Sequence, residues 1–224
     1  MDSMNPEDID ALFFDFDGVL ADSVNVKTEA FAALFAHHGS DVEQKVVKHH
    51  LANGGMTRRD KFKVYYQEFL KEPLSAEKME ELCEGFAQLV VEKVIAADEI
   101  PGAENFLKEY TQKASVPAFV ISATPQEEIE LIVARRGWSK YFKEVLGAPT
   151  SKGEHVARLV DDYGYNTTKC FFFGDALSDY NAAAEHQVPF VALAEDEASI
   201  LVKTYPEMTW YTNFEEIRKS YGIS

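Results

Sequence analysis

Residues 12–20 read Leu-Phe-Phe-Asp-Phe-Asp-Gly-Val-Leu, an apolar run that carries two carboxylates, Asp15 and Asp17, and then turns at Gly18. Burying an ionised carboxylate without a partner is energetically costly, so two acids beside a hydrophobic strand imply a compensating cation, most simply a metal ion. The stretch therefore predicts a buried strand that delivers an acidic site at its far end.

Short apolar runs recur along the chain, and helical patterns lie between them. The runs are at 11–16, 116–121, 144–147, 170–173 and 188–193, and several are apolar at consecutive positions. Strands that are buried on both faces of a parallel sheet have this pattern. The alternation predicts an α/β fold with a doubly wound, Rossmann-like parallel sheet, whose ligands bind outside the carboxyl ends of the strands.

Two helix starts carry capping signals. Residues 124–127, Thr-Pro-Gln-Glu, match a capping box with proline at the first helical position, and Gly137 supplies the stop. Residues 151–154, Ser-Lys-Gly-Glu, offer a second capping box for a helix that ends near Gly164. We therefore expect one helix between each capping box and the glycine that follows it.

A helical block interrupts the alternation just after the first strand. Its four helix-like segments lie at 24–38, 41–51, 57–71 and 75–96. Glycines and a proline separate these segments, and no strand is expected among them. Such a block is most simply an inserted domain, so we expect an α/β core of residues 1–22 and 97–224 and a helical domain of residues 23–96.

Within the insert, large apolar side chains at helical spacing predict a packed core. Adjacent histidines point to different faces of a helix, so His37-His38 and His49-His50 are expected at exposed helix ends and not at a metal site. The expected core residues are Phe31, Leu34, Phe35, Phe62, Tyr65, Tyr66 and Phe69.

The composition limits the partners and the compartment. The 224 residues carry a net charge of −16, which disfavours nucleic acid and anionic membranes as partners. Cys83 and Cys170 have no Cys-x-x-Cys spacing, so neither a disulfide framework nor a zinc site is indicated. No apolar run approaches the ~18 residues that a membrane span needs, and the N-terminus is acidic where a signal peptide is basic. We expect a soluble cytoplasmic protein.

Chemistry-bearing side chains follow four of the expected strands, and in a parallel sheet they would converge on one edge. Several acids, one hydroxyl and one ammonium suit a hard cation with a phosphoryl group, because Mg²⁺ takes few protein carboxylates and accepts phosphate oxygens. The residues are Asp15 and Asp17 after the first strand, Ser122 at the end of the second, Lys152 beyond the third, and Asp175 and Asp179 after the fourth.

These residues resemble, in order, the four motifs of the haloacid dehalogenase (HAD) superfamily: Asp-Phe-Asp-Gly-Val-Leu, Ser122, Lys152, and Gly174-Asp175-x-x-x-Asp179. The resemblance covers essentially the whole chain. The insert resembles the cap of the subgroup that includes phosphoglycolate phosphatase and β-phosphoglucomutase. The resemblance implies a HAD core with an α-helical cap, and a Mg²⁺-dependent phosphatase acting on a small phosphorylated metabolite of the phosphoglycolate or sugar phosphate class.

The resemblance also implies roles for the strand-end residues. Asp15 would be the nucleophile that forms an aspartyl-phosphate, and Asp17 would act first as an acid and then as a base. Ser122 would donate to a phosphoryl oxygen, and Lys152 would bridge that oxygen and Asp15.

The implied metal site takes its ligands from two motifs. Asp175 would bind Mg²⁺ together with Asp15 and the main-chain carbonyl of Asp17, and Asp179 would act on the ion directly or from just behind its ligands. The residues expected to contact the substrate from the core are Gly18, Ser122, Ala123 and Lys152.

The insert contributes a candidate substrate loop, Gly54-Gly55-Met56-Thr57-Arg58-Arg59, in which two cations follow a glycine turn. It resembles the specificity loop of helical caps, with Arg58 at the arginine of a Gly-x-x-Arg pattern. A guanidinium binds carboxylate or phosphate through paired hydrogen bonds, so Arg58 and Arg59 are substrate candidates, and Lys27 is another. The alternative is that both arginines face solvent or pair with Asp60 and Glu68.

Two other functions stay open. A phosphomutase would return the phosphoryl group to a sugar, but the β-phosphoglucomutase relatives have a histidine at the position of Lys27. A non-enzymatic phosphoacceptor such as a receiver domain has a similar acidic pocket, but it has no helical insert after its first acidic strand end. The motifs leave the oligomeric state, monomer or homodimer, undecided.

Overall fold

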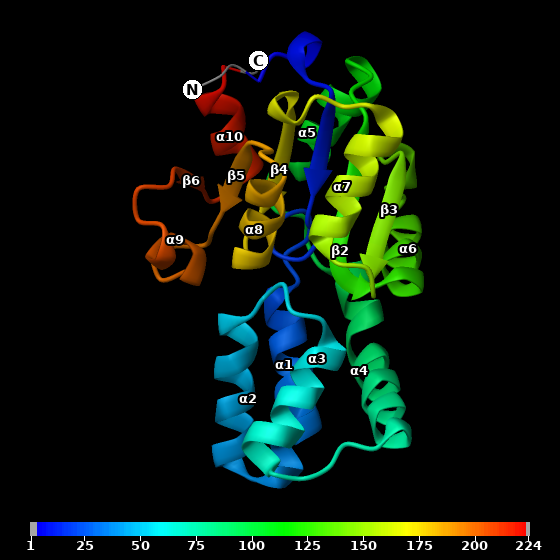
Figure 1. Ribbon diagram of the computed structural model, residues 1–224, viewed down its shortest axis with the longest axis vertical. Coiled ribbons are helices and arrows are strands. Elements are labelled where there is room, and N and C mark those ends of the chain that lie inside the picture. The colour runs from blue at the N-terminus through cyan, green and yellow to red at the C-terminus, as the bar shows by residue number, and fades with distance from the viewer. Residues whose placement is uncertain (1–3, 223–224) are drawn as a thin grey trace.

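Six parallel strands form the sheet around which the chain is built, in the order β3-β2-β1-β4-β5-β6 (Figure 1). The computed structural model describes residues 4–222. The strands are β1 Ala11–Phe14, β2 Ala118–Pro125, β3 Glu144–Ala148, β4 Cys170–Gly174, β5 Phe190–Leu193 and β6 Trp210–Tyr211. The prediction of a doubly wound parallel sheet is confirmed, and β6, which has only two residues, is an edge strand that the sequence pattern did not predict.

Helices cover both faces of the sheet, which explains why the strands are apolar at consecutive positions. The helices of this part are α5 Ala103–Leu107, α6 Gln126–Arg135, α7 Lys152–Tyr163, α8 Leu177–Glu185, α9 Ile200–Thr204 and α10 Phe214–Ser220. Ala11 and Phe13 of β1 pack with α7 and α8, whereas Leu12 and Phe14 pack with α5, α6 and α10. A π-helical stretch at Lys108–Lys113 continues α5.

The insert is helical throughout its regular structure and lies beyond the carboxyl ends of the strands (Figure 1). Its helices are α1 Val24–Phe35, α2 Ser40–Ala52, α3 Arg58–Val64 and α4 Ala76–Ala96, and a π-helical stretch at Tyr65–Leu70 continues α3. The expected aromatic core is confirmed: five of the seven residues are buried, and the other two are partly buried against them. The buried ones are Phe31, Phe35, Phe62, Tyr65 and Tyr66.

The two capping boxes had different outcomes. Ser151 and Glu154 form the predicted box at the start of α7, which ends at Gly164 with a φ of 66°. The box at Thr124 is wrong, because β2 continues to Pro125, which pairs with β3, and α6 begins only at Gln126. A residue before proline prefers an extended backbone, which suits the strand and not the helix.

One histidine prediction is also wrong. His37 is exposed, and His38 and His49 are partly exposed, but His50 is buried. It follows the buried Val46 by four residues and so lies on the inward face of α2.

Within residues 4–222, no helix combines the length and the apolar character that crossing a bilayer requires.

Candidate active site

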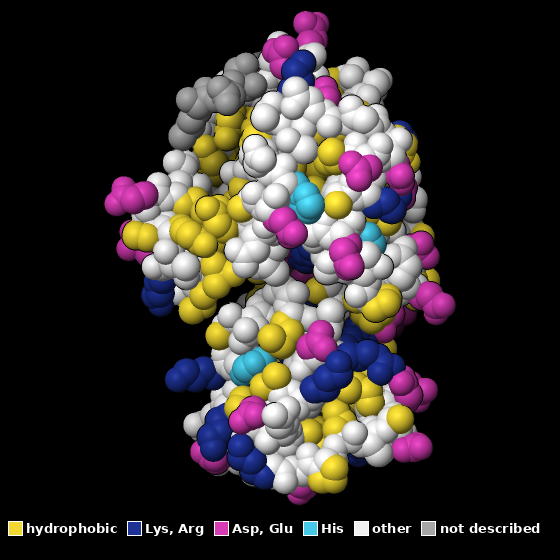
Figure 2. Space-filling view, viewed as in Figure 1, with side chains coloured by type: hydrophobic (Ala, Val, Ile, Leu, Met, Phe, Trp, Pro, Cys, Tyr) yellow, Lys and Arg dark blue, Asp and Glu magenta, His cyan; other side chains and the backbone are white. Residues whose placement is uncertain are grey.

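A cavity of about 510 Å³ lies between the carboxyl edge of the sheet and the insert. Figure 2 shows the surface hollowed between these two parts of the molecule. The sheet side contributes six of the residues that the sequence marked, and the insert contributes two of its three candidate cations. They are Asp15, Asp17, Gly18, Ser122, Ala123 and Asp175 from the core, and Lys27 and Arg58 from the insert.

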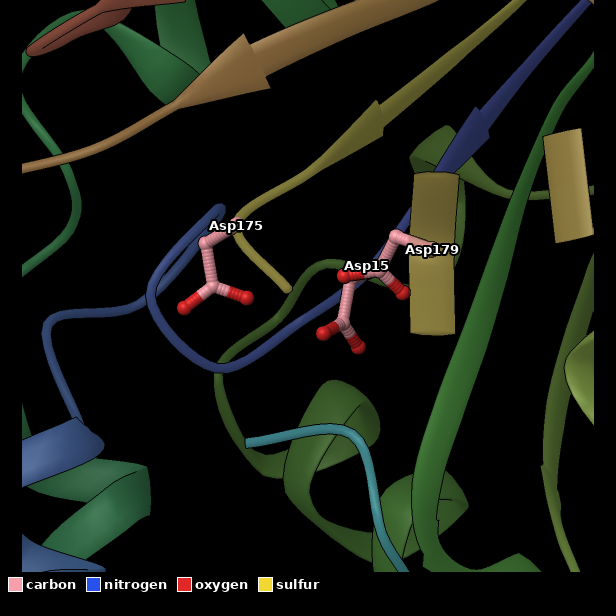
Figure 3. Close-up of side chains that lie close together, drawn as sticks. All are labelled: Asp15, Asp175 and Asp179. Carbon is pink, nitrogen blue, oxygen red and sulfur yellow. The ribbon is translucent and has the colours of Figure 1, made fainter. Parts of the chain in front are cut away.

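Three carboxylates gather at the centre of this edge. Asp15 directly follows β1, Asp175 directly follows β4, and Asp179 is in the first turn of α8 (Figure 3). Each offers a carboxylate oxygen within 4.8 Å of the others. The main-chain N–H of Asp15 donates to the carbonyl of Phe173 at 2.9 Å, so the pairing of β1 with β4 fixes where Asp15 stands.

Lys152 lies between two of the carboxylates. Its Nζ is 2.9 Å from Asp15 Oδ2 and donates to Asp179 Oδ1 at 2.5 Å. The other oxygen of Asp179 accepts from the main-chain N–H of Ala176 at 3.0 Å, so both oxygens of this carboxylate are bonded. Burial opposes the charge on Lys152, but the two carboxylates outweigh it and raise the pKa of the ammonium.

The negative charge of the cluster exceeds what one lysine can balance. Burial raises the pKa of Asp15 to about 7, with Lys152 opposing the rise and Asp179 adding to it. Burial and the neighbouring Asp15 also raise the pKa of Asp175 well above its usual value. A divalent cation would remove this penalty, so the donor set fits Mg²⁺, which prefers carboxylate oxygens.

Gly18 makes room for this arrangement. Its φ is +77°, a left-handed backbone, and a Cβ at this position would overlap the carboxylate of Asp175. Ser122 was expected to end the second strand, but β2 continues to Pro125, so Ser122 is buried inside the strand. Its Oγ accepts from the N–H of Thr124 at 3.1 Å. The hydroxyl hydrogen of Ser122 can therefore donate into the cavity that it lines.

Asp17 is held by side chains that the sequence analysis did not assign to it. Ser23 donates to Asp17 Oδ1 at 2.6 Å, Thr124 donates to Oδ2 at 3.3 Å, and Lys27 forms an ion pair with the same carboxylate. Burial alone would raise the pKa of Asp17, but Lys27 and Ser23 outweigh it and lower the pKa. Lys27 comes from α1, so the insert touches the second carboxylate of the motif directly.

The arginine partners differ from the expectation. Arg58 contacts Glu128 of α6 through both ends of its guanidinium, at 2.8 and 2.5 Å, and Arg59 pairs with Glu80 of α4. Neither arginine pairs with Asp60 or Glu68, which bind Lys63 and Lys71. The pairing of Arg58 joins insert to core across 70 residues of sequence, which no local pattern reveals.

Two further residues of the cavity were missed by the sequence analysis. Lys61 and His50 line it from the insert, and both are buried. A weak signal existed, because Lys61 is three residues after Arg58 and four before Tyr65, so it shares a face with the cap core.

The turn after α2 lies against the start of α8. A Cβ on Gly54 would be 3.5 Å from the Cβ of Ala176, and one on Gly55 would overlap the side chain of Ser178. The insert therefore closes over the edge that carries the acids, and this closure depends on the small size of the turn.

The sequence model of the haloacid dehalogenase-like hydrolases matches residues 9–187. No sequence among the curated proteins matches the chain significantly.

Solved structures share the fold over nearly their whole length. A predicted phosphoglycolate phosphatase from Haemophilus somnus has a TM-score of 0.74 at 17% identity, covering 95% of this chain and 97% of its own. β-Phosphoglucomutase from Clostridium difficile has a TM-score of 0.75 at 20% identity, with coverages of 96% and 97%. CbbY from Rhodobacter sphaeroides, solved with xylulose-(1,5)bisphosphate, has a TM-score of 0.71 at 15% identity, with coverages of 93% and 96%.

Proposed function

The chain belongs to the haloacid dehalogenase-like hydrolase family, and from that premise we propose that it is a Mg²⁺-dependent phosphatase. Its substrate would be a phosphomonoester of a small metabolite, hydrolysed through an aspartyl-phosphate. The observation that carries the proposal is the buried Lys152, which bridges Asp15 and Asp179. Asp15 and the neighbouring Asp175 line a cavity of about 510 Å³.

Asp15 acts as the nucleophile in this proposal. One of its oxygens attacks phosphorus, the bond between phosphorus and the ester oxygen breaks, and Asp17 gives a proton to the departing alkoxide. In the second half of the reaction, water attacks phosphorus and loses a proton to Asp17. The bond between phosphorus and the Asp15 oxygen breaks, so phosphate is released and the Asp15 carboxylate is restored. The ion pair with Lys27 favours the ionised Asp17 that the second half needs, and it must loosen for the first half.

Donors around the phosphoryl group stabilise the transition state. Ser122 and Lys152 would donate to its oxygens, and each such donor is typically worth about 10²–10³ in rate. When bound, Mg²⁺ neutralises charge on the phosphoryl group. Asp15, Asp175 and the main-chain carbonyl of Asp17 would hold it. Because both oxygens of Asp179 are bonded, we assign Asp179 to orienting Lys152.

The test is hydrolysis of para-nitrophenyl phosphate. Wild-type protein with Mg²⁺ should release nitrophenol, and excess EDTA or Asp15→Asn should lower the rate at least about 1000-fold. Asp41→Asn is the matched control, because this carboxylate is exposed and pairs with Lys45 one helical turn away. Full activity of Asp15→Asn, or in EDTA, would contradict the mechanism.

A coupled isomerisation assay on hexose 1-phosphates with a bisphosphate activator distinguishes the phosphatase from the phosphomutase alternative. The phosphatase proposal expects phosphate release and no isomerised sugar. The structural neighbours include proteins of both kinds, so their names favour a small phosphorylated metabolite without choosing between the reactions.

The setting of the enzyme is part of the proposal. We place the core at residues 1–22 and 97–224 and the cap at residues 23–96, with a monomer or homodimer as the working form. The free thiols of Cys83 and Cys170 are typical of a reducing compartment, which supports the cytoplasm. The net charge of −16 argues against nucleic acid and anionic membranes as partners.

A further inference from the structure

Three lysine or arginine side chains line the cavity, all from the insert, and two of them are already paired. Lys27 pairs with Asp17, and Arg58 is occupied by Glu128. Lys61 forms no ion pair with any carboxylate of residues 4–222. The cavity is therefore lined by one lysine that has no carboxylate in ion-pair contact within the described residues.

Lys61 is deeply placed for an unpaired charge. Its relative exposure is 2%, and its Nζ lies 2.8 Å from His50 Nδ1 and 5.3 Å from the centre of the Phe31 ring. An aromatic face offsets only part of the cost of burying an ammonium. Burial and the nearby Lys27 lower the pKa of Lys61 to about 7, while Asp17 and Asp175 oppose the shift. Lys61 thus interacts electrostatically with the acidic residues at the carboxyl edge of the sheet.

His50 adds an unsatisfied donor beside this cation. Burial, with Lys61 and Lys27, lowers the pKa of His50 to about 3, so the ring is neutral at physiological pH. When the Lys61 ammonium donates to Nδ1, the ring proton is on Nε2. Nε2 is buried and has no hydrogen-bond partner within the described chain, although His50 lines the cavity. Such a group in a native structure calls for an absent partner.

We propose that Lys61 and His50 bind a second anionic group of the substrate, at the end remote from the phosphoryl group that is transferred. The ammonium supplies the charge and the Nε2–H supplies a directed hydrogen bond. The inference rests on the phosphatase function proposed above and narrows its substrate class to phosphomonoesters that carry a distal carboxylate or second phosphate. A cavity of about 510 Å³ is of the size that holds such a metabolite.

Matched substrate pairs test this assignment. Phosphoglycolate against ethyl phosphate probes a distal carboxylate, and glucose 1,6-bisphosphate against glucose 1-phosphate probes a distal phosphate. In at least one pair, wild-type kcat/KM should be roughly 10- to 100-fold higher for the substrate with the second anion, chiefly through KM, since a hydrogen bond to a charged group is worth that much. The pair that shows the preference identifies the anion.

Variants connect the preference to the two residues. Lys61→Met and His50→Leu should each lower the ratio at least about 10-fold, and Lys61→Arg should restore part of it. Lys63→Met is the control, because this lysine is on the same helix, pairs with Asp60 and has a side chain 64% exposed. The control should keep the wild-type ratio.

The failure modes are separable. A wild-type ratio near one in both pairs overturns this inference while leaving the phosphatase standing, provided para-nitrophenyl phosphate is hydrolysed. Hydrolysis of none of the substrates overturns the proposed function instead. An unchanged ratio in folded Lys61→Met also overturns the inference, and if that variant does not fold, the wild-type ratio and His50→Leu decide.

Discussion

Asp15 and Lys61 mark the two sides of the cavity with buried charges of opposite sign. Burial raises the pKa of the Asp15 carboxyl to about 7 and lowers the pKa of the Lys61 ammonium to about 7. Shifts of this kind cluster at functional sites. In the two proposals above, Asp15 gains a divalent cation as a partner in addition to Lys152, and Lys61 gains an anionic group of the substrate.

A residue-scale prediction concerns stability and pH. The pKa of Lys61 is 10.5 in the unfolded chain and about 7 in the folded protein. Between these two pH values the unfolded state therefore binds more protons than the folded state, and stability rises with pH. Lys61 should therefore destabilise the protein by up to about 5 kcal/mol at and below pH 7, and the penalty should fade towards pH 10.5. Lys61→Met should raise the free energy of unfolding at pH 7, measured by urea denaturation.

The gain should shrink as pH rises, and Lys63→Met should show no such trend. The groups that act on Lys61 are His50, Lys27, Asp17 and Asp175, and all of them remain in the variant. A variant that is more stable yet less selective fits a functional lysine. A Lys61→Met protein that is less stable than wild type at pH 7 would contradict this account.

Sequence reasoning at this scale anticipated that the acids and Lys152 lie together, and it missed the partners of the cations in the insert. The acids follow apolar strands, so their burial could be inferred from their neighbours in the sequence. The partner of Arg58 is 70 residues away on α6, and the isolation of Lys61 depends on how α3 packs against α1 and α2. Neither relation leaves a local pattern.

At the scale of elements, a local capping signal predicted a helix start correctly at Ser151 and incorrectly at Thr124, where pairing with a neighbouring strand overrides it. The start of α7 was predictable because Ser151 and Glu154 bond to one another within a single turn. The end of β2 was not, because its last residues are held extended by β3, and Thr124 instead binds Lys27 at 2.8 Å. Because β2 continues past Thr124, this residue contacts Lys27 and Asp17 and does not cap the helix that follows.

The turn between α2 and α3 gives an element-scale prediction. Gly55→Ala would place a Cβ against Ser178 and so oppose closure of the insert on α8. Since overpacking costs about 1–3 kcal/mol, we expect kcat/KM to fall about 10-fold or more. The measurement is steady-state kinetics with para-nitrophenyl phosphate, alongside a melting curve to show that the variant folds.

A second-site change makes this prediction specific. Ser178→Gly in the Gly55→Ala background removes the overlapping side chain and should recover most of the activity. Gly85→Ala, in α4 and 3.4 Å from a Leu34 methyl group, is the control that should leave activity unchanged. If the double variant stays as inactive as Gly55→Ala, the loss of activity does not come from the overlap with Ser178, and this account of closure is contradicted.

At the scale of the whole molecule, two chain segments connect the sheet to the insert, and they run side by side. The N–H of Asp22 donates to the carbonyl of Asp98 at 2.9 Å, and that of Ile100 donates to Leu20 at 3.1 Å. Arg136 binds the carbonyls at the end of α4, next to the second connection, at 2.7–3.1 Å. This arrangement suits a hinge about which the insert opens to admit substrate and closes to exclude water.

The net charge of the whole protein and the charged side chains of the cavity act differently on an anionic ligand. The net charge of −16 repels anionic ligands at long range, so the phosphate group must be recognised locally. In the proposed function Ser122 and Lys152 bind the phosphoryl group, and the insert places Lys61 on the other side of the same cavity. The molecule needs both parts to bind and to react.

The central claim is that Asp15 accepts the phosphoryl group, and intact-protein mass measurement after rapid acid quenching tests it most directly. Asp17→Asn should be used with para-nitrophenyl phosphate, because nitrophenolate leaves without a proton while hydrolysis of the intermediate lacks its base. We predict a chain carrying one added phosphoryl group, mapped by peptide sequencing to Asp15. Nitrophenol release with no phosphorylated chain at any quench time, or a phosphoryl group on another residue, would contradict the account.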